Sequence, residues 1–399
     1  MNKPTLQEQD IYAKAVELVE KQRGKLEITL KVEINNLDDL SVAYTPGVAE
    51  PTRRVRDDKS LQYRYTARGS QVAVITDGSA VLGLGNIGPE AAQVVMEGKA
   101  AMLKVFAGAD AFPLCLASQD PEDIIRVAKL VEPTFSMIFL EDISAPRCFL
   151  IEERLQDELN IPVFHDDQHG TAISSCAALR NALKLTGRSL DTTRIVINGT
   201  GAAGIGTARL LFAMGAQDIT LCDSNGALYP GRTTGMNPWK EALTGKTNRR
   251  GDKTLAQALS GADVFIGLSV AGAVSRDMVA SMAGDAIVLA MANPVPEIMP
   301  PDALAAGARI VGTGRSDFPN MVNNLHAFPG IVRGALNARA SMVNDAMKLA
   351  AVQVIAGFVP DAELTADTIL PNPLSPELAA AVAAAVEQAA RESGVAGVK

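Results

Sequence analysis

Short apolar runs alternate with amphipathic stretches along most of this chain. The runs have the length of buried strands, and the stretches between them repeat their apolar positions at helical spacing. Strands that alternate with helices in this way predict parallel α/β sheets. The predicted strands are 71–76, 112–117, 136–140, 162–165, 194–198, 218–222, 264–268, 286–290 and 309–312.

Helix signals fill the intervals between these strands and the two ends of the chain. Thr5 and Glu8 form a capping box that predicts a first helix, and Ser375 with Pro376 predicts the start of the last one. The other predicted helices cover 89–106, 121–131, 147–159, 170–185 and the residues between a glycine loop and Met214.

The glycine pattern G-x-G-x-x-G occurs twice, in different surroundings. Gly83, Gly85 and Gly88 are followed at once by Pro89, which favours a structural turn near a site. The second copy, GTGAAG, follows a predicted strand and opens a helix, the arrangement that holds a dinucleotide pyrophosphate. A strand-to-helix turn without a ligand is the alternative. The expected cofactor-binding residues of this copy are Gly199, Gly201, Ala202, Ala203 and Gly204.

Asp223 ends the strand after this loop, 19 residues beyond Gly204. A carboxylate at that point is placed to accept hydrogen bonds from the adenosine ribose. It would also repel a 2′-phosphate, so NAD is slightly favoured over NADP. Cations between residues 246 and 253 leave NADP open, because they can reach a phosphate once the chain folds.

Acidic side chains gather where two neighbouring predicted strands end. Glu141 and Asp142 close one strand, and Asp166 and Asp167 close the next. The carboxyl ends of parallel strands face the ligand crevice, so these acids are expected to converge. A hard divalent cation, Mg²⁺ or Mn²⁺, would relieve their repulsion. Separate loop acids or helix caps are an equally open interpretation.

His165 and His169 flank the second pair of acids in the pattern HDDQH. A zinc-binding pair of histidines at this spacing needs a helix. The segment is expected to leave a strand, so zinc is not favoured.

Lys99 and Tyr44 are candidates for proton transfer. Lys99 lies in the middle of the apolar stripe of the helix 89–106, where burial would lower its pKa and prepare a general base. A snorkelling lysine with its ammonium in water is the alternative. Tyr44 precedes Thr45-Pro46-Gly47, a rigid turn that would hold its hydroxyl as a general acid, and an ordinary core tyrosine is the alternative.

Composition narrows the class of protein. Asp and Glu number 45 against 37 Lys and Arg, a net charge of −8, which argues against a nucleic-acid-binding protein. No apolar stretch reaches the length of a membrane span, and the first residues lack the apolar core of a signal peptide. The four cysteines are scattered without a CxxC pair, so we expect a reduced, cytoplasmic protein.

Taken together, these motifs resemble the malic enzyme family, in whose order they occur along nearly the whole chain. Each motif alone is weak, but the set is specific. The matching segments are YTPGVA (44–49), ITDGSAVLGLGNIG (75–88), MEGKAAMLKVFAG (96–108), LEDI (140–143), FHDDQHGTA (164–172), GTGAAG (199–204), ANPVPE (292–297) and SDFPNMVNNLHAFPGIVRGAL (316–336).

The resemblance implies an N-terminal α/β catalytic domain, 1–162, and a Rossmann-type NAD(P)-binding domain with C-terminal helices, 163–399. It implies oxidation and decarboxylation of (S)-malate to pyruvate and CO2 with NAD or NADP and Mg²⁺ or Mn²⁺, in a homodimer or larger homo-oligomer. The implied roles are general acid for Tyr44, general base for Lys99, orientation of that lysine for Asp166, metal ligation for Glu141, Asp142 and Asp167, and substrate contact for Asn293 and Asn324, with Asn293 also at the cofactor.

One position departs from the family pattern. Larger members carry an arginine in the TDG segment that grips the substrate carboxylate, and Ala80 stands there in this chain. Ser79, loop amides or another cation would have to replace it. Two other functions stay open. A metal-free amino-acid dehydrogenase would leave the acids at the strand ends without a task, and a non-catalytic NAD-binding regulator would leave Lys99 unexplained.

Overall fold

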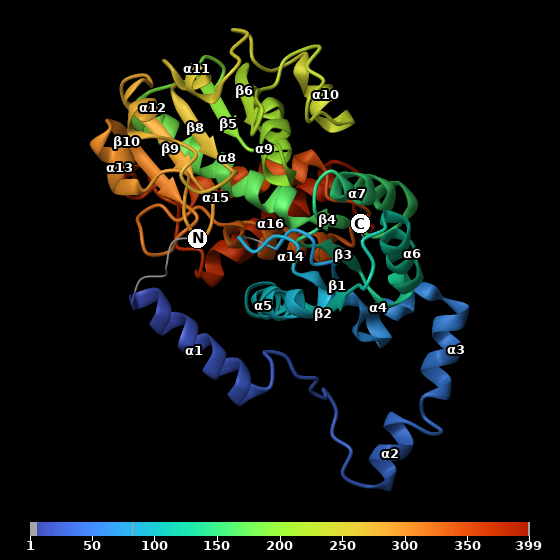
Figure 1. The fold of residues 1–399 in the computed structure, drawn as a ribbon. Helices are drawn as coiled ribbons and strands as arrows, with labels where there is room; N and C mark the ends of the chain where they lie inside the picture. The colour runs from blue at the N-terminus through green and yellow to red at the C-terminus, as the bar shows by residue number, and fades with distance from the viewer. Residues whose placement is uncertain (1–5, 82, 398–399) are drawn as a thin grey trace.

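The computed structural model describes residues 6–81 and 83–397. Thr5 lies outside these residues, so the capping box expected for the first helix stays a prediction. In the described part of the chain, two mainly parallel sheets with their helices form a body, and a long N-terminal segment stands apart from it (Figure 1). No helix in that part combines the length and the apolarity that crossing a membrane requires.

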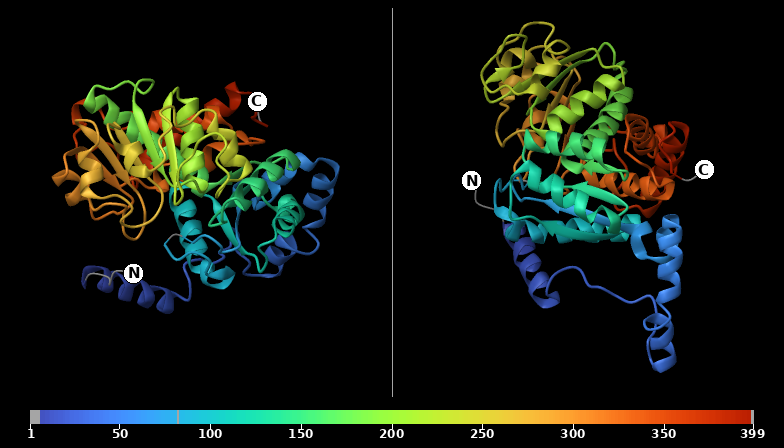
Figure 2. Two further views of the ribbon diagram at one scale, coloured as in Figure 1. Left: turned by 45° about the horizontal axis from the view of Figure 1, so that its top comes forward. Right: turned by 90° about the vertical axis from the view of Figure 1, so that its right-hand side faces the viewer.

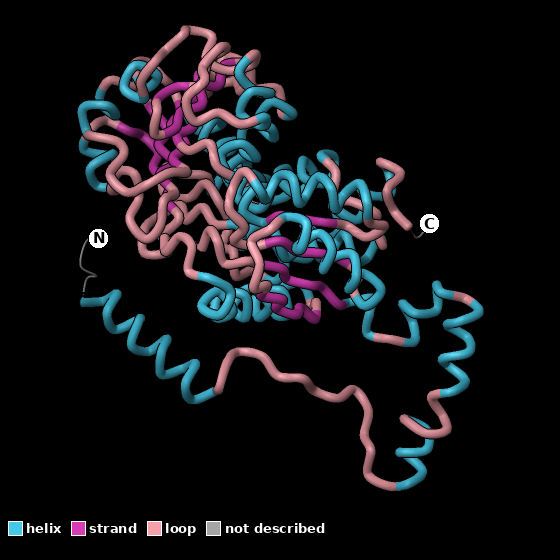
Figure 3. The backbone as a smooth tube through the Cα atoms, turned by 45° about the vertical axis from the view of Figure 1, so that its right-hand side comes forward, coloured by secondary structure: helices cyan, strands magenta, loops and turns pink. Residues whose placement is uncertain are grey.

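We call residues 6–58 the arm. Figure 3 shows it as separate helices joined by extended chain that loops away from the body. Lys25 connects the arm to the body, because its backbone N–H donates to Glu97 and its ammonium donates to the Val94 carbonyl, each at 2.8 Å. The arm and the turns after it comprise α1 (Leu6–Gln22), α2 (Leu37–Ala43), α3 (Ala49–Asp57), η1 (Lys59–Leu61), α4 (Gln62–Tyr65) and η2 (Ala67–Ser70).

The first sheet has four parallel strands in the order β2-β1-β3-β4. Leu140 of β3 lies between Ile75 of β1 and His165 of β4, so the residues after these strands emerge side by side. This register brings the acids that follow β3 and β4 to one edge. The elements are β1 (Gln71–Thr76), α5 (Gly88–Ala107), β2 (Asp110–Cys115), α6 (Pro121–Val131), η3 (Glu132–Thr134), β3 (Met137–Leu140), α7 (Arg147–Glu158) and β4 (Val163–His165).

The second sheet has the order β10-β9-β8-β5-β6-β7, and β7 runs antiparallel to β6. The strand order reverses between β5 and β8, the switch point at which such sheets bind dinucleotides. The elements are α8 (Asp166–Thr186), β5 (Arg194–Asn198), α9 (Ala202–Ala213), β6 (Asp218–Asp223), β7 (Gly226–Ala227), α10 (Pro238–Thr244), α11 (Leu255–Leu259), β8 (Val264–Gly267), α12 (Arg276–Ala280), β9 (Ala286–Ala290), α13 (Pro300–Ala305) and β10 (Ala308–Thr313).

The C-terminal helices connect the two halves of the body. Helices α14 and α16 pack on each other and on α5, and α15 packs on α8. Figure 2 shows these helices, coloured orange to red, against the body. The chain therefore returns to the helix that carries Lys99. The elements are η4 (Asn324–His326), α14 (Phe328–Ala338), α15 (Asp345–Gly357), η5 (Asp361–Glu363) and α16 (Pro376–Glu392).

The structure confirms the predicted α/β architecture, with local shifts. Strand β2 begins at Asp110 rather than at residue 112. Helix α8 begins at Asp166 rather than at residue 170, so the expectation that HDDQH leaves the strand without a helix is wrong. Carboxylates in a first helical turn are stabilised by the positive end of the helix dipole. Strand β4 pairs with β3, so the first sheet continues past residue 162, where we predicted the domain division.

A buried carboxylate on α7 fixes the first turn of α8. Glu152 accepts hydrogen bonds from the His165 backbone N–H at 3.0 Å, from Gln168 Nε2 at 2.8 Å and from His169 Nε2 at 2.9 Å. Burial raises the pKa of this carboxyl, but His169, His165 and Lys348 outweigh burial and lower the pKa to about 2. The His165 backbone and the His169 ring are thus both engaged in joining α7 to α8.

We predict that Glu152→Gln lowers the free energy of unfolding by about 3 kcal/mol at neutral pH, because a pKa held at about 2 instead of 4.5 corresponds to that energy. The folded pKa lies below the unfolded one. The contribution is therefore present above pH 4.5 and is lost as the pH falls toward 2. In urea titrations, the difference between variant and wild type should shrink from about pH 5 to about pH 3.

The matched control is Asp157→Asn on the exposed side of α7, which should change stability by less than about 0.5 kcal/mol. A cost of Glu152→Gln that is the same at every pH would contradict an ionised Glu152.

Candidate active site

Lys99 of α5 lies between two acids at the edge of the first sheet. Its Nζ is 2.7 Å from Asp166 Oδ2 and 3.0 Å from Glu141 Oε1. The ring centre of Phe328 lies 4.4 Å from the same nitrogen, and the lysine side chain is only 11% exposed. The apolar stripe of α5 therefore delivers this lysine into the body, and the snorkelling alternative is wrong.

The charge of Lys99 differs from the expectation drawn from the sequence. Burial lowers its pKa, but the attraction of Asp166 and Glu141 outweighs burial and raises the pKa above the ordinary lysine value. Lys99 is therefore an ammonium ion in the chain by itself. The expectation that burial alone prepares a neutral base is wrong, because it left out the two carboxylates that the fold brings to this nitrogen.

Glu141, Asp142 and Asp167 form a cluster in which one carboxylate oxygen of each lies within 4.8 Å of the others. The first two side chains are buried and the third is half-buried. The backbone N–H of Asp142 donates to Asp167 Oδ2 at 2.9 Å, which joins the ends of β3 and β4. Asp142 has a φ of +55°, in the left-handed region that aspartate and asparagine adopt more readily than other non-glycine residues.

This carboxylate cluster fits a hard divalent cation. Burial raises the pKa of Glu141 well above its usual range; Lys99 opposes that rise, and three neighbouring acids add to it. Within the described residues, Glu141 Oε2 is buried and has no hydrogen-bond partner. Bound positive charge would remove this repulsion, and a donor set made of oxygens suits Mg²⁺ or Mn²⁺.

Asp166 is wholly buried and joins the lysine to the C-terminal part of the chain. Its Oδ2 also accepts a hydrogen bond from Asn324 Nδ2 of η4. One turn along α8, a Cβ at Gly170 would lie 2.0 Å from Asp166 Oδ1, so only glycine leaves room for this carboxylate. The fold thus brings Lys99, Asp166 and Asn324 together, as their expected roles require.

The second glycine loop has the close packing expected of a dinucleotide site. A Cβ at Gly199 would lie 2.1 Å from the Leu268 carbonyl, and one at Gly204 would lie 1.7 Å from the Gly199 carbonyl. A Cβ at Gly201 would meet nothing within 4 Å, so this glycine borders open space. Ala202 and Ala203 begin α9 at that point, whose N-terminus offers backbone N–H groups to an anion.

Asp223 lies at the end of β6 beside the loop, and two cations neutralise it. Arg232 Nη2 donates to both carboxylate oxygens at 2.6 and 2.7 Å, and Lys240 Nζ donates to Oδ2 at 2.8 Å. Burial raises the pKa of Asp223, but Lys240 and Arg232 outweigh burial and lower it. The repulsion of a 2′-phosphate that we expected from a bare carboxylate is therefore removed. The cations responsible lie outside residues 246–253, where we looked for them.

Asn293 lies in the loop after β9, between the two halves of the body. A Cβ at Gly314 would lie 2.5 Å from Asn293 Nδ2. A Cβ at Gly83 would lie 2.9 Å from the Asn293 carbonyl, so the first glycine pattern packs directly on this loop. This close contact agrees with the expectation that Gly83, Gly85 and Gly88 belong to a structural turn near the site.

Tyr44 is the one expected site residue that the chain by itself places elsewhere. It caps the C-terminus of α2 on the arm, and it is 66% exposed. Figure 1 shows α2 at the far end of the arm, away from the helix that carries Lys99. A tyrosine packed in the core, the alternative drawn from the sequence, is wrong.

Asp77 and the half-buried Arg147 form an ion pair that the sequence analysis missed. Asp77 follows β1 and is wholly buried, and Arg147 Nη2 lies 3.0 Å from its Oδ2. Ser79 Oγ accepts from the Ser144 backbone N–H at 2.9 Å, so the TDG turn is joined to the loop after β3. The signal was available, because Asp77 ends a strand of the same sheet as Glu141.

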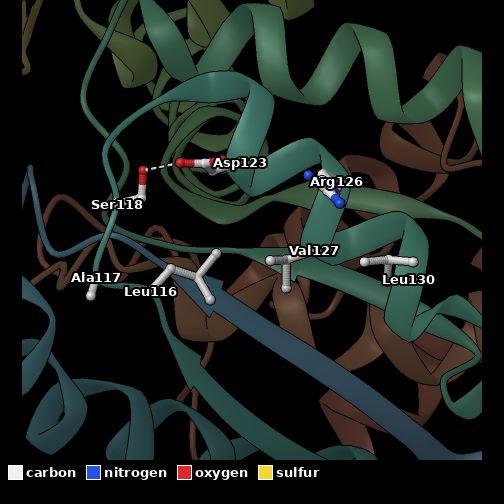
Figure 4. A pocket seen from close by; sticks show the side chains of 7 residues that line it. All are labelled: Leu116, Ala117, Ser118, Asp123, Arg126, Val127 and Leu130. Carbon is white, nitrogen blue, oxygen red and sulfur yellow. Dashed lines mark hydrogen bonds between the residues drawn. The ribbon is translucent and has the colours of Figure 1, made fainter.

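In the described part of the chain, two surface hollows that lie outside the carboxylate cluster bear on the site. One of about 290 Å³ borders the Asp223–Arg232 pair and is lined by Asn225, Tyr229, Gly231, Arg232, Thr233 and Thr234. The other, of about 500 Å³, lies between the end of β2 and α6. Figure 4 shows its aliphatic wall and, on its rim, the hydrogen bond from Ser118 to Asp123. Strand β2 is the edge strand opposite β4, so this hollow is separate from the Lys99 site.

Two relatives in sequence and one in structure are similar to this chain over most of its length. The Bifunctional malic/malolactic enzyme of Bacillus subtilis is 57% identical over 96% of this chain and 93% of its own length. The NADP-dependent malic enzyme of Rhizobium meliloti is 50% identical over 94% of this chain, which spans about half (51%) of that relative. The crystal structure of the NAD-dependent malic enzyme of Thermotoga maritima is 45% identical, with a TM-score of 0.90 over 94% of this chain and 98% of that one.

The two halves of the body also match two family models. The model described as malic enzyme, N-terminal domain matches residues 23–156, and the model described as malic enzyme, NAD binding domain matches residues 168–391. Because both models match in sequence order and together cover most of the chain, this protein belongs to the malic enzyme family.

Proposed function

We propose that this chain oxidises (S)-malate and decarboxylates it to pyruvate and CO2, with NAD or NADP as hydride acceptor and Mg²⁺ or Mn²⁺ in the carboxylate cluster. The observation that carries the proposal is the Lys99 ammonium held between Asp166 and Glu141, at the border of that cluster. A metal-free amino-acid dehydrogenase and a non-catalytic regulator leave this combination of lysine and acids unused, and the family membership argues against both.

The cluster Glu141–Asp142–Asp167 would hold the cation, as its oxygen donors and the raised pKa of Glu141 support. When bound, the cation would supply positive charge beside the substrate, and the nicotinamide would supply the hydride acceptor. Asn293 and Asn324 would orient the malate carboxylates with their amides. Arg147, beside the TDG turn, is the cation that could stand in for the arginine missing at Ala80.

Lys99 would handle the proton of the substrate hydroxyl. In the chain by itself, its two carboxylate neighbours keep the ammonium protonated. With Glu141 engaged as a ligand in the cluster, Lys99 would lose one of the charges that raise its pKa. Its ammonium could then release a proton, and the neutral Nζ could accept the hydroxyl proton. Asp166, which is held in turn by Asn324, keeps that nitrogen in place.

Either cofactor fits the end of β6. Asp223 is paired with both Arg232 and Lys240, so the group as a whole is positive and tolerates a 2′-phosphate, while the carboxylate remains near the ribose hydroxyls. The adjoining hollow of about 290 Å³ offers space for that end of the cofactor. This arrangement supports acceptance of both NAD and NADP over the slight preference for NAD drawn from Asp223 alone.

The arm supports a homodimer. Ile28, Leu30 and Leu37 are each at least 75% exposed, and none of the residues of α2 and α3 is buried. Large apolar side chains at every second position, Leu26, Ile28, Leu30, Val32 and Ile34, give residues 26–34 the pattern of a strand. A short exposed helix with no apolar partner is marginal in water. A second copy of the chain would cover this surface and receive Tyr44 in its site.

Tyr44 would then supply the proton that C3 of the product requires after CO2 has left. A hydroxyl brought from the partner chain approaches the Lys99 site from outside the body, so acid and base act from different sides of a small substrate. The four free cysteines, three of them buried, support function in a reducing compartment such as the cytoplasm.

A malolactic reaction is a second candidate, favoured by the name of the 57% identical Bacillus relative. In that reaction pyruvate would stay bound, and the hydride on the cofactor would return to its C2 and give lactate. No net oxidation would result. Lactate measured beside pyruvate distinguishes the two outcomes.

The proposed function predicts initial rates that need malate, a nicotinamide cofactor and a divalent cation together. With Mn²⁺ present, reduced cofactor and pyruvate should form in equal amounts with either NAD or NADP. Chelation should lower the rate by at least about 100-fold, and added Mn²⁺ should restore it. Turnover that survives complete chelation would favour the metal-free alternative, and no turnover with either cofactor would overturn the proposal.

Lys99→Met should lower kcat by about 10²- to 10⁴-fold, because the hydroxyl proton loses its acceptor. NADPH binding, followed by fluorescence, should stay near that of the wild type, which shows that the fold is intact. The matched control is Lys104→Met on the same helix, whose exposed ammonium pairs with Asp110 and which should keep the wild-type kcat. Near-native turnover in the Lys99 variant excludes the assigned role.

Mixing two inactive variants tests whether Tyr44 serves the partner chain. Tyr44→Phe and Lys99→Met should each be inactive. If the arms are exchanged, half of the sites in mixed dimers regain both groups, and an equal mixture should recover about a quarter of the wild-type rate. Lys99→Met mixed with Asp142→Asn is the control that should not recover, because both changes lie in the body. No recovery in the first mixture would mean that Tyr44 serves its own chain.

A further inference from the structure

Glu297 is a fully buried acid that the proposed chemistry does not use. It lies in the loop between β9 and α13, and its carboxylate has no exposed surface. Three donors meet it: the Ser269 backbone N–H at 2.7 Å, Ser269 Oγ at 3.1 Å and the Ala292 backbone N–H at 3.0 Å. These donors are two amides and a hydroxyl, and no lysine or arginine in the described part of the chain pairs with this carboxylate. Burial raises the pKa of Glu297 above its usual value, and the hydrogen bonds from Ala292 and Ser269 oppose that rise.

The absence of a side chain at Gly267 leaves space for the Glu297 carboxylate. A Cβ at Gly267, the last residue of β8, would lie 2.4 Å from Glu297 Cδ, so only glycine fits there. The backbone around it is joined as well, because the Val274 N–H donates to the Glu297 carbonyl and the Gly272 N–H donates to the Pro296 carbonyl. The loop after β8 and the loop after β9 are therefore one hydrogen-bonded unit with the carboxylate at its centre.

On one side, this unit reaches the dinucleotide loop. Ser269 Oγ accepts a hydrogen bond from Asn198 Nδ2 at 2.8 Å, and Asn198 is the residue before Gly199. The Leu268 N–H donates to the Asn198 carbonyl at 2.7 Å, and the Leu268 carbonyl is the atom that a Cβ at Gly199 would strike. The position of Ser269 therefore sets the position of the glycine loop.

On the other side, the unit reaches the proposed substrate contact. Ala292, whose N–H donates to Glu297 Oε2, is followed directly by Asn293. Both ends of this link lie at the carboxyl ends of β8 and β9, the edge of the sheet that faces ligands. Burying a carboxylate without a cation is costly, and an apolar residue here would pack without joining the two loops.

We propose that Glu297 is a positioning residue that ties the cofactor loop to the substrate loop, with Oε1 holding Ser269 on the cofactor side and Oε2 holding Ala292 and Asn293 on the substrate side. This inference rests on the proposed function, since it uses malate as the ligand of Asn293. Cofactor and substrate are thereby held at a fixed separation. Loss of the hydrogen bonds to one carboxylate oxygen should therefore affect the binding of one ligand more than that of the other.

Glu297→Gln tests the hydrogen bond on the substrate side, from the Ala292 N–H to Oε2, with almost no change in side-chain shape. The amide oxygen accepts best at Ser269, where two donors converge, and the amide nitrogen then faces the Ala292 N–H, donor against donor. We expect KM for malate to rise about tenfold, while the Kd of NADPH changes by less than about threefold. A purely structural acid would lower the melting temperature without this split.

Ser269→Ala tests the hydrogen bonds on the cofactor side. Ser269 lies in a half-buried loop that tolerates the change. It removes the hydroxyl that links Asn198 to Glu297 but keeps the backbone N–H. The expected split is the reverse: the Kd of NADPH rises at least about threefold, and KM for malate changes less. Should Glu297→Gln fail to fold, Ser269→Ala alone still decides whether this link positions the cofactor loop.

Asp263→Asn is the matched control. Asp263 is a partly buried acid at the opposite end of β8 that also joins loops, through Arg188 Nε at 3.1 Å and the Arg194 backbone N–H at 2.8 Å. The same carboxylate-to-amide change there should lower the melting temperature and leave both KM and Kd unchanged. Wild-type KM and Kd in Glu297→Gln and Ser269→Ala would overturn the inference. A wild-type chain that does not oxidise malate would instead overturn the proposed function.

Discussion

The site depends on one electrostatic constraint: more carboxylates meet at the ends of β3 and β4 than the buried cation among them can neutralise. Lys99 balances Asp166 and part of Glu141. The Glu141–Asp142–Asp167 cluster places further carboxylate oxygens within 4.8 Å of one another, and burial increases the cost of their charge. The fold tolerates this repulsion because the four acids are attached to a paired sheet edge and to the first turn of α8, where backbone dipoles favour negative charge.

The same edge explains why the neighbouring polar groups are so tightly joined. Glu152 of α7 fixes the start of α8 through the backbone of His165 and the side chains of Gln168 and His169. Asn324 fixes Asp166 from the side of the C-terminal helices. Repelling groups stay at short range only when each is oriented by a partner that cannot move away. The hydrogen-bonded surroundings therefore belong to the site as much as the acids do.

Much of this arrangement could be predicted from the sequence, for a physical reason. Strands buried on both faces are recognisable in the sequence as apolar runs. Parallel pairing places the residues that follow these strands at one edge of the sheet. The acids after β3 and β4 could therefore be expected together: Glu141, Asp142, Asp166 and Asp167. The charge of Lys99 could not be predicted, because it depends on which acids come within 3 Å of its nitrogen. Likewise, nothing in the local pattern at Asp223 reveals that Arg232 and Lys240 fold back onto it.

Tyr44 shows a different limit of sequence reasoning. The motif YTPGVA identifies the residue, but the chain by itself leaves it on an exposed arm, far along the sequence and in space from the lysine that it is expected to serve. The acids and the lysine lie on packed strands and helices, whereas the proposed proton donor lies on a segment with no buried residue in α2 or α3. The carboxylate cluster and the second glycine loop are therefore assembled within one chain, whereas the proposed proton transfer from Tyr44 would depend on what the arm packs against. If a second copy of the chain covers the arm as proposed, assembly and chemistry are linked, because the free energy of covering the apolar surface would bring the hydroxyl into place.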